Sequence, residues 1–154
     1  MQTYDEASRY MTGLPHPDLD RQFYDGVPAR RLVAWVFDVI VIGTLSVLVS
    51  LLTLGIGFFF IGVIGVAISF VYRVLTLGSR SATLGMRAVG IELRDRDGVR
   101  FTTAQAIVHT LAYMICFSFL LPQVISMLMM VGTRYGQGIP DVLMGSTAIN
   151  SPAD

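Results

Sequence analysis

In Arg30-Arg31-Leu-Val-Ala-Trp-Val-Phe-Asp38, an arginine pair opens an apolar run that lasts to Leu54. As one helix, Leu32 to Leu54 would be roughly 34 Å long at about 1.5 Å per residue. That length crosses a hydrocarbon core of about 30 Å with modest tilt. We therefore expect a membrane-spanning helix over about 32–54.

The carboxylate of Asp38 lies two turns inside this predicted helix and needs a compensating partner. A carboxylate at the centre of a membrane helix costs about 2.5–3.5 kcal/mol on insertion scales, so it should face protein rather than lipid. Arg31 shares its helix face, and we expect the partner to be Arg31 or a basic group of another helix. Two interpretations remain open, a structural clamp between helices and a proton or cation site.

The composition is typical of a membrane protein. The chain is 53% hydrophobic and 14% charged, whereas soluble domains carry about 25% charged residues. The net charge is zero and acidic residues alternate with the arginines of 76–103, so we expect no nucleic-acid partner. Cys116 is the only cysteine, which excludes a disulfide framework within the chain and any cysteine-based metal spacing. No metal and no cofactor is expected.

A second apolar run, Phe58 to Leu75, follows a tight turn at 54–57 and is long enough to cross the membrane. Residues 32–75 are therefore predicted to form a helical hairpin with almost nothing outside the membrane at its tip. Small residues on one face allow membrane helices to pack closely. They lie at helical spacing on both arms: Gly43, Ser46 and Ser50 on the first, and Gly62, Gly65 and Ser69 on the second.

Residues 76–103 form the substantial polar segment between the apolar runs. Val89, Ile91 and Leu93 alternate with polar residues, as in a strand, and Asp97-Gly98 favours a tight turn. We expect a small β-hairpin over 88–102 at the membrane surface. If residues 146–149 pair with it, the C-terminal segment must lie on the same side of the membrane.

The third apolar run, Ala104 to Val131, would be roughly 42 Å long as one helix. That is long for one crossing and short for two. Pro122 near its middle should bend it. We expect one tilted, kinked span, with a bent pair of half-helices as the alternative, and we expect His109 at the membrane interface.

These features predict an all-α polytopic membrane protein. A polar N-terminal tail (1–29) precedes a membrane domain (30–149) with spans over about 32–54, 58–75 and 104–131, and a short tail (150–154) follows. Arginines are enriched in cytoplasmic segments, so the N-terminus and the loop 76–103 are predicted to be cytoplasmic. The arginines that carry this prediction are Arg9, Arg21, Arg30, Arg31, Arg73, Arg80, Arg87, Arg94, Arg96 and Arg100.

Three motifs follow one another along the chain. The first, R-x-x-A-x-x-x-D, is formed by Arg31, Ala34 and Asp38. The second, T-x-G-[KM]-R before a G-x-x-V segment and a D-G turn, is matched by Thr83-Leu84-Gly85-Met86-Arg87, Gly90-Ile91 and Asp97-Gly98. The third, H-D-x-x-x-G-T, is matched by Asp141, Gly145 and Ser146-Thr147. In these motifs, over about residues 28–149, the chain resembles the RDD family of small bacterial membrane proteins.

The resemblance implies a location in the bacterial plasma membrane and a functional role for Arg31, Asp38 and Asp141. Some members have been linked to cation/proton antiport, in which the arginine and aspartates are invoked. The chain departs from the family pattern at three polar positions, which hold Met86, His109 and Pro140. Candidate polar partners of the motif residues are Arg30, Arg73, Arg87 and His109.

Two functions remain open. The first is an accessory or assembly subunit of a larger membrane complex, such as a respiratory one, because three short spans cannot enclose a pathway alone and small-residue faces suit docking. The second is an oligomeric cation/proton antiporter or other small-solute transporter with Asp38 as the titrating group. Expected partners are the lipid bilayer and other membrane subunits or further copies of the chain. No nucleophile–base pair or pair of acids is evident, so no enzymatic activity is expected.

Overall fold

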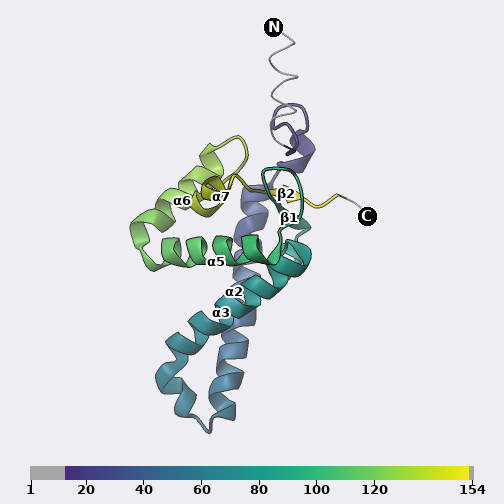
Figure 1. The fold of residues 1–154 in the computed structure, drawn as a ribbon. Helices are drawn as coiled ribbons and strands as arrows, with labels where there is room; N and C mark the ends of the chain where they lie inside the picture. Colours follow the sequence, from purple (N-terminus) through teal and green to yellow (C-terminus); the bar gives the residue numbers. More distant parts are fainter. Residues whose placement is uncertain (1–12, 153–154) are drawn as a thin grey trace.

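The computed structural model describes residues 13–152, so residues 1–12 of the predicted N-terminal tail and 153–154 of the C-terminal tail lie outside the described part. Within it, two long helices form a hairpin, and a bent pair of helices projects from the end opposite the hairpin tip (Figure 1). The elements are η1 (Arg21–Phe23), α2 (Val27–Leu52), η2 (Ile56–Phe60), α3 (Ile61–Arg80), α4 (Leu84–Ala88), β1 (Ile91–Arg94), α5 (Thr103–Ser118), α6 (Leu120–Gly132), α7 (Ile139–Met144) and β2 (Thr147–Asn150).

The hairpin consists of α2 and α3, each long and apolar enough to cross a membrane. Gly26, in the left-handed conformation at φ 71°, precedes α2, and a proline occupies its first turn, where no backbone donor is lost. Leu54 and Gly55 adopt positive φ at the tip. α2 begins before its predicted apolar run and α3 ends after its own, because helical hydrogen bonding continues into flanking polar residues. Residues 58–60 lie in the 3₁₀ turn η2, which leads directly into α3, and the candidate span covers both elements, Ile56–Arg80.

Of the two arrangements expected for 104–131, the structure shows the alternative, a bent pair of half-helices, in place of one kinked helix. The segment forms two helices, α5 and α6, bent by 117° at the break between them. Pro122 lacks an N–H, and its ring would clash with the carbonyl of Ser118 in a continuous helix. The chain therefore leaves the helix at Phe119, whose φ and ψ of −124° and 127° are extended, and Pro122 lies in the first turn of α6.

The expected β-hairpin over 88–102 is also wrong. β1 pairs antiparallel with β2, from Ile91 opposite Asn150 to Arg94 opposite Thr147. The turn at Asp97-Gly98 forms, but only one bridge, between Arg94 and Arg100, follows it. The returning chain is drawn away because the Phe101 N–H donates to Ser81 Oγ and its side chain is buried.

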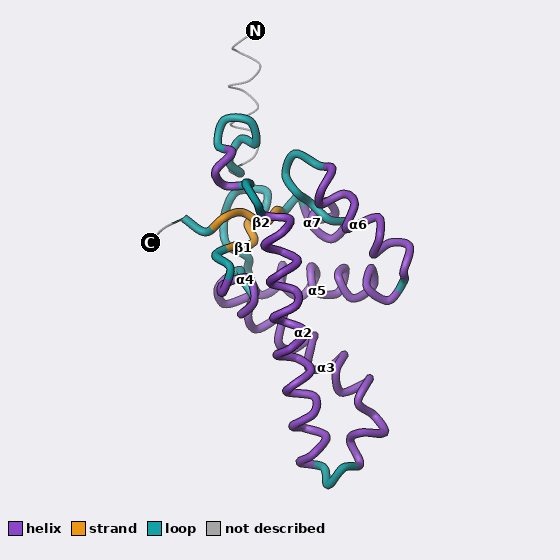
Figure 2. Tube along the Cα trace, turned by 180° about the vertical axis from the view of Figure 1, so that it is seen from behind, coloured by secondary structure: helices purple, strands orange, loops and turns teal. Residues whose placement is uncertain are grey.

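The apolar core lies where α2, α3, α4, α5 and the two strands meet. Seen from behind, α4 and both strands gather beside the first half of α2 (Figure 2). The core residues are Val27, Ala34, Leu77, Ala82, Met86, Ile91, Leu93, Phe101, Ala106 and Ala148. The rest of the hairpin and the α5–α6 pair lie outside this core, and their large apolar side chains remain exposed. An apolar surface of this extent suits lipid rather than water.

Candidate functional site

Asp38 lies in α2 at 2% exposure and is held by three donors. The Tyr72 hydroxyl donates to Oδ1 at 2.6 Å, the Gly85 N–H donates to Oδ1 at 2.9 Å, and the Thr83 hydroxyl donates to Oδ2 at 2.7 Å. Asp38 therefore joins α2 to α3 and to the start of α4.

The donors of Asp38 are themselves fixed by backbone groups. Thr83 caps α4, since its Oγ1 accepts the Met86 N–H at 3.1 Å. The Tyr72 oxygen accepts the Leu84 N–H at 3.0 Å. At Gly85, a Cβ would overlap the Ala34 carbonyl oxygen and crowd Asp38, so only glycine permits this approach. Tyr72, Thr83 and Gly85 thus form a cradle for the Asp38 carboxylate in which all three hydrogen-bond donors are uncharged.

The predicted pairing of Asp38 with Arg31 is wrong. Among the described residues, no ion pair involves Asp38. Helical side chains tilt toward the N-terminus, so Arg31 reaches away from the middle of α2 rather than down its face. Neutral donors from Tyr72, Thr83 and Gly85 replace the expected basic partner.

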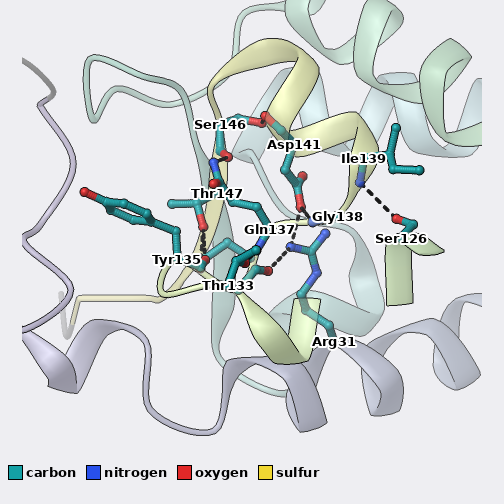
Figure 3. A network of polar contacts seen from close by, with 12 residues as sticks. Arg31, Ser126, Thr133, Tyr135, Gln137, Gly138, Ile139, Asp141, Ser146 and Thr147 are labelled. Atoms are coloured by element: carbon teal, nitrogen blue, oxygen red, sulfur yellow. Dashed lines mark hydrogen bonds and ion pairs between the residues drawn. The ribbon is translucent and has the colours of Figure 1, made fainter. Parts of the chain in front are cut away.

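Arg31 instead binds Asp141, at the first turn of α7. Arg31 Nη1 lies 2.6 Å from Asp141 Oδ2 and also donates to the Gly136 carbonyl at 3.2 Å. The Gly138 N–H donates to the same carboxylate oxygen at 3.0 Å. His109 Nε2 lies 2.9 Å from the other oxygen, Oδ1. Figure 3 shows Arg31 directed from its helix toward Asp141.

His109 is enclosed by the protein, and its expected location at the membrane interface stays a prediction. The side chain is 5% exposed, and its ring meets the Phe101 ring edge-on with 5.6 Å between centroids. The sequence did not indicate its partner, Asp141, because that residue comes from a segment 32 residues later. α5 runs beside α7, so the histidine is turned inward.

Burial by itself raises the pKa of the Asp141 carboxyl. The charge of Arg31 and the contact with His109 lower this pKa by more, so it lies well below its usual range. Asp141 has no exposed surface, whereas the Arg31 side chain retains 15% exposure. A buried carboxylate of this kind is kept ionised by its partners.

The segment around Asp141 is organised by further polar contacts, which Figure 3 displays. The Thr133 hydroxyl accepts the Gln137 N–H at 2.9 Å, and the Gln137 side chain donates to the Ser146 carbonyl at 2.6 Å. The Thr147 hydroxyl donates to the Tyr135 carbonyl at 2.6 Å. Ser126 of α6 accepts the Ile139 N–H at 3.0 Å. These bonds connect α6, α7 and β2 into one support for the carboxylate.

The other candidate partners do not join either carboxylate. Arg30 donates to the Val89 carbonyl at 3.0 Å. Arg73 is 9% exposed, and its Cζ lies 3.9 Å from the centroid of the Tyr113 ring. Arg87 is exposed on α4. Neither carboxylate lines the two hollows described on the surface, one between Gly13 and Phe23 and one formed by Leu32, Val33, Val36, Phe37 and Ile40.

The small residues predicted to pack helices divide into two groups. Ser46 and Ser50 are buried, and a Cβ on Gly65 would lie 3.6 Å from Ser46 Oγ, so these positions serve the contact between α2 and α3. Gly43 and Gly62 have open space where a Cβ would be. Ser69 is half-buried. The hairpin therefore uses part of the small-residue pattern internally and leaves part of it open.

Sequence reasoning assigned no role to Tyr72, Thr83 or Gly85 in holding Asp38. Thr83 and Gly85 both fall in the T-x-G motif, and that motif was the signal that could have found them. No group of three or more histidine, cysteine or acidic residues suited to a metal ion occurs in the described part of the chain.

A family model described as "RDD family" matches residues 26–145, which is most of the chain and includes both carboxylate clusters. The match confirms the resemblance seen in the three motifs. No curated protein and no solved structure matches the chain.

Proposed function

Since the chain belongs to the RDD family of membrane proteins, we propose that it is an accessory or assembly subunit of a larger membrane complex. The observation that carries the proposal is the state of its two buried carboxylates. Asp38 accepts three hydrogen bonds from neutral donors, and Asp141 is paired with Arg31. Both carboxylates thus join helices within the chain, which is the role of a structural clamp.

The open surfaces support docking to other membrane helices. The α5–α6 pair exposes large apolar side chains along both helices, and Gly43 and Gly62 leave gaps on the hairpin. Small residues allow helix backbones to approach closely in lipid. A larger assembly would use these surfaces, while the polar end of the hairpin holds the subunit together.

The proposal includes a topology. Because β1 pairs with β2, the segments before α5 and after α6 lie together, so the bent pair enters and leaves the membrane at one face. Arginines concentrate near that face, which favours the cytoplasmic side for the N-terminus, the 81–102 loop and β2. The protein then has two full spans and one re-entrant pair in the plasma membrane. No catalytic chemistry is assigned to it.

The test is extraction in mild detergent followed by native electrophoresis and mass spectrometry of co-migrating proteins. We expect stoichiometric partner subunits, and we expect Gly62→Leu to release them without unfolding the hairpin, because open space surrounds Gly62. Val63→Leu, at the adjacent exposed position, is the control for added bulk. A homo-oligomer alone in the wild type, or unchanged migration of Gly62→Leu, overturns the proposal.

Cation/proton antiport is the second candidate, and the buried imidazole of His109 favours it. Nε2 meets Asp141, while Nδ1 has no partner among the described residues, so a buried imidazole with one open nitrogen lies beside the Arg31–Asp141 ion pair. The test is cation-driven proton movement in vesicles with equal amounts of wild type and Asp38→Asn. Activity in the wild type that is lost in Asp38→Asn would support transport and oppose the accessory role. Absence of activity in the wild type removes the candidate.

A further inference from the structure

Arg73 is a buried cation without an anionic partner among the described residues. It is 9% exposed on α3, and its Nε is enclosed with no hydrogen-bond acceptor. The contact found for its guanidinium is the face of Tyr113, with 3.9 Å between Cζ and the ring centroid. The buried carboxylates of Asp38 and Asp141 are already occupied by other donors. The described chain therefore supplies no counter-ion.

An unpaired guanidinium at this depth is costly. Arg73 precedes Arg80, the last residue of α3, by two turns, or roughly 10 Å along the helix. A cation–π contact offsets only part of the cost of removing a guanidinium from water. Its planar donors match the oxygens of a phosphate group in a two-point arrangement. The missing partner is thus expected to be an oxyanion from outside the described residues.

The surroundings of Arg73 identify the source of that oxyanion. Trp35 Nε1 donates to the Tyr113 hydroxyl at 3.1 Å, so the two aromatic side chains are joined beside the guanidinium. Tryptophan and tyrosine are enriched at the headgroup level of membranes. Phe117 stacks on Tyr113 with 5.8 Å between centroids and is 52% exposed, which extends an apolar surface outward from the site. The guanidinium of Arg73 next to the exposed apolar surface at Phe117 suits a ligand with a charged headgroup and an apolar tail.

We propose that Arg73, with Tyr113 and Trp35 beside it, binds the phosphate of a membrane phospholipid whose acyl chains lie along the exposed face of α5. The lipid supplies the counter-ion that the described part of the chain does not provide, and it fixes the crossing of α3 and α5. This site is independent of the proposed accessory role, since it requires only the membrane.

The test uses the purified full chain in a maltoside detergent, which carries no phosphate. Phosphatidylglycerol is added, and thermal unfolding and native mass spectrometry are recorded. For the wild type we expect a higher unfolding temperature with lipid and one retained phospholipid. For Arg73→Gln we expect loss of both effects. Arg80→Gln is the matched control, because Arg80 lies exposed on the same helix and should keep both.

Several outcomes overturn the proposal. One is a wild type that gains no stability and retains no phospholipid, a result that does not depend on whether any variant folds. A second is equal retention by Arg73→Gln and the wild type. A third is the same thermal shift with inorganic phosphate alone, which would indicate a site for a free anion. A fourth is an unchanged lipid count in Arg73→Gln together with loss of a co-purifying protein, which would assign the guanidinium to a partner's carboxylate. Arg73→Lys retains charge without the planar fork and is expected to keep a reduced shift.

Discussion

Arg31 at the start of α2 and Asp141 in α7 form a 2.6 Å ion pair across 110 residues of sequence. Breaking a buried pair by removing one partner typically costs about 3–5 kcal/mol, because a charge is left uncompensated. We expect Arg31→Met to reduce the free energy of unfolding by about that amount, and Arg31→Met/Asp141→Leu to recover part of it. Denaturant unfolding in detergent measures both.

The matched control for this pair is Arg30→Met. Arg30 is exposed and donates to a single backbone carbonyl, that of Val89. We expect a loss of about 1 kcal/mol or less. Equal losses for the two arginine variants would contradict the importance of the pair.

The stability of the protein should fall in acid through Asp141. Its folded pKa is lowered by Arg31 and His109, so the unfolded state takes up a proton first as the pH falls. The contribution is therefore fully present above the unfolded carboxyl pKa of about 3.9 and is lost as the pH decreases below it. Unfolding temperatures from pH 7 to pH 3 test this. Asp141→Asn lacks this pH-dependent contribution, so the difference in unfolding temperature between the variant and the wild type should shrink in acid. If the two plots of unfolding temperature against pH run parallel, the assignment to Asp141 is refuted.

Asp38→Asn should be tolerated, whereas Asp38→Leu should not. The asparagine oxygen can accept from Tyr72 and Gly85, and the Thr83 hydroxyl can turn to accept from the new amide, so we expect a loss of about 1 kcal/mol or less. Leucine leaves three donors unsatisfied at about 1–3 kcal/mol each. We also expect Arg31→Ala to lose more than Asp38→Asn. The comparison of unfolding free energies decides, and equal losses for the Asn and Leu variants would count against the cradle.

Gly85→Ala should strongly reduce folded protein, because its methyl group would overlap the Ala34 carbonyl oxygen and push α4 from α2. Gly62→Ala is the control, since nothing lies within 4 Å of the added carbon. We expect several-fold less folded monomer by size-exclusion chromatography for Gly85→Ala and no change for Gly62→Ala. A normal yield of Gly85→Ala would mean that the close approach is not required.

Cysteines placed at Gln22, Arg96 and Asn150 should all react from the cytoplasmic side. The antiparallel pairing of β1 with β2 puts Asn150 opposite Ile91 in the sheet whose β1 strand leads on to Arg96, and Asn150 donates to the carbonyls of Gln22 and Asp25. Cys116, which is buried, is replaced by alanine as background. Labelling of any one position by an impermeant reagent from outside would overturn the orientation.

The sequence was sufficient for the hairpin, because hydrophobic length and the glycine turn act locally. It also indicated that Asp38 must face protein, since the cost of a carboxylate in lipid does not depend on which partner compensates it. The sequence did not identify that partner, because the donors from Tyr72, Thr83 and Gly85 are uncharged. Only tertiary packing directs these groups toward Asp38.

Long-range partners account for the other errors. The sequence of β1 has a strand pattern, but periodicity does not specify which segment pairs with it. In the structure β1 pairs with β2 instead of with the chain that follows the Asp97-Gly98 turn. The contact of His109 with Asp141 was not predicted because the two residues are distant in sequence. For Pro122, the sequence predicted the bend but not its 117° size, which depends on how α6 docks through Ser126.

The two carboxylates also differ in when their partners are synthesised. The donors to Asp38 lie within 47 residues of it, so that cradle can close while the ribosome is still translating the second half of the chain. Arg31 must wait for Asp141, and the stretch from Met86 to Asp141 takes on the order of 3–10 s at about 5–20 residues per second. During that interval the inserted hairpin carries an uncompensated arginine at its polar end. A nascent chain interrupted there would present this arginine, together with an unpaired β1 edge, to the insertion machinery and to membrane proteases.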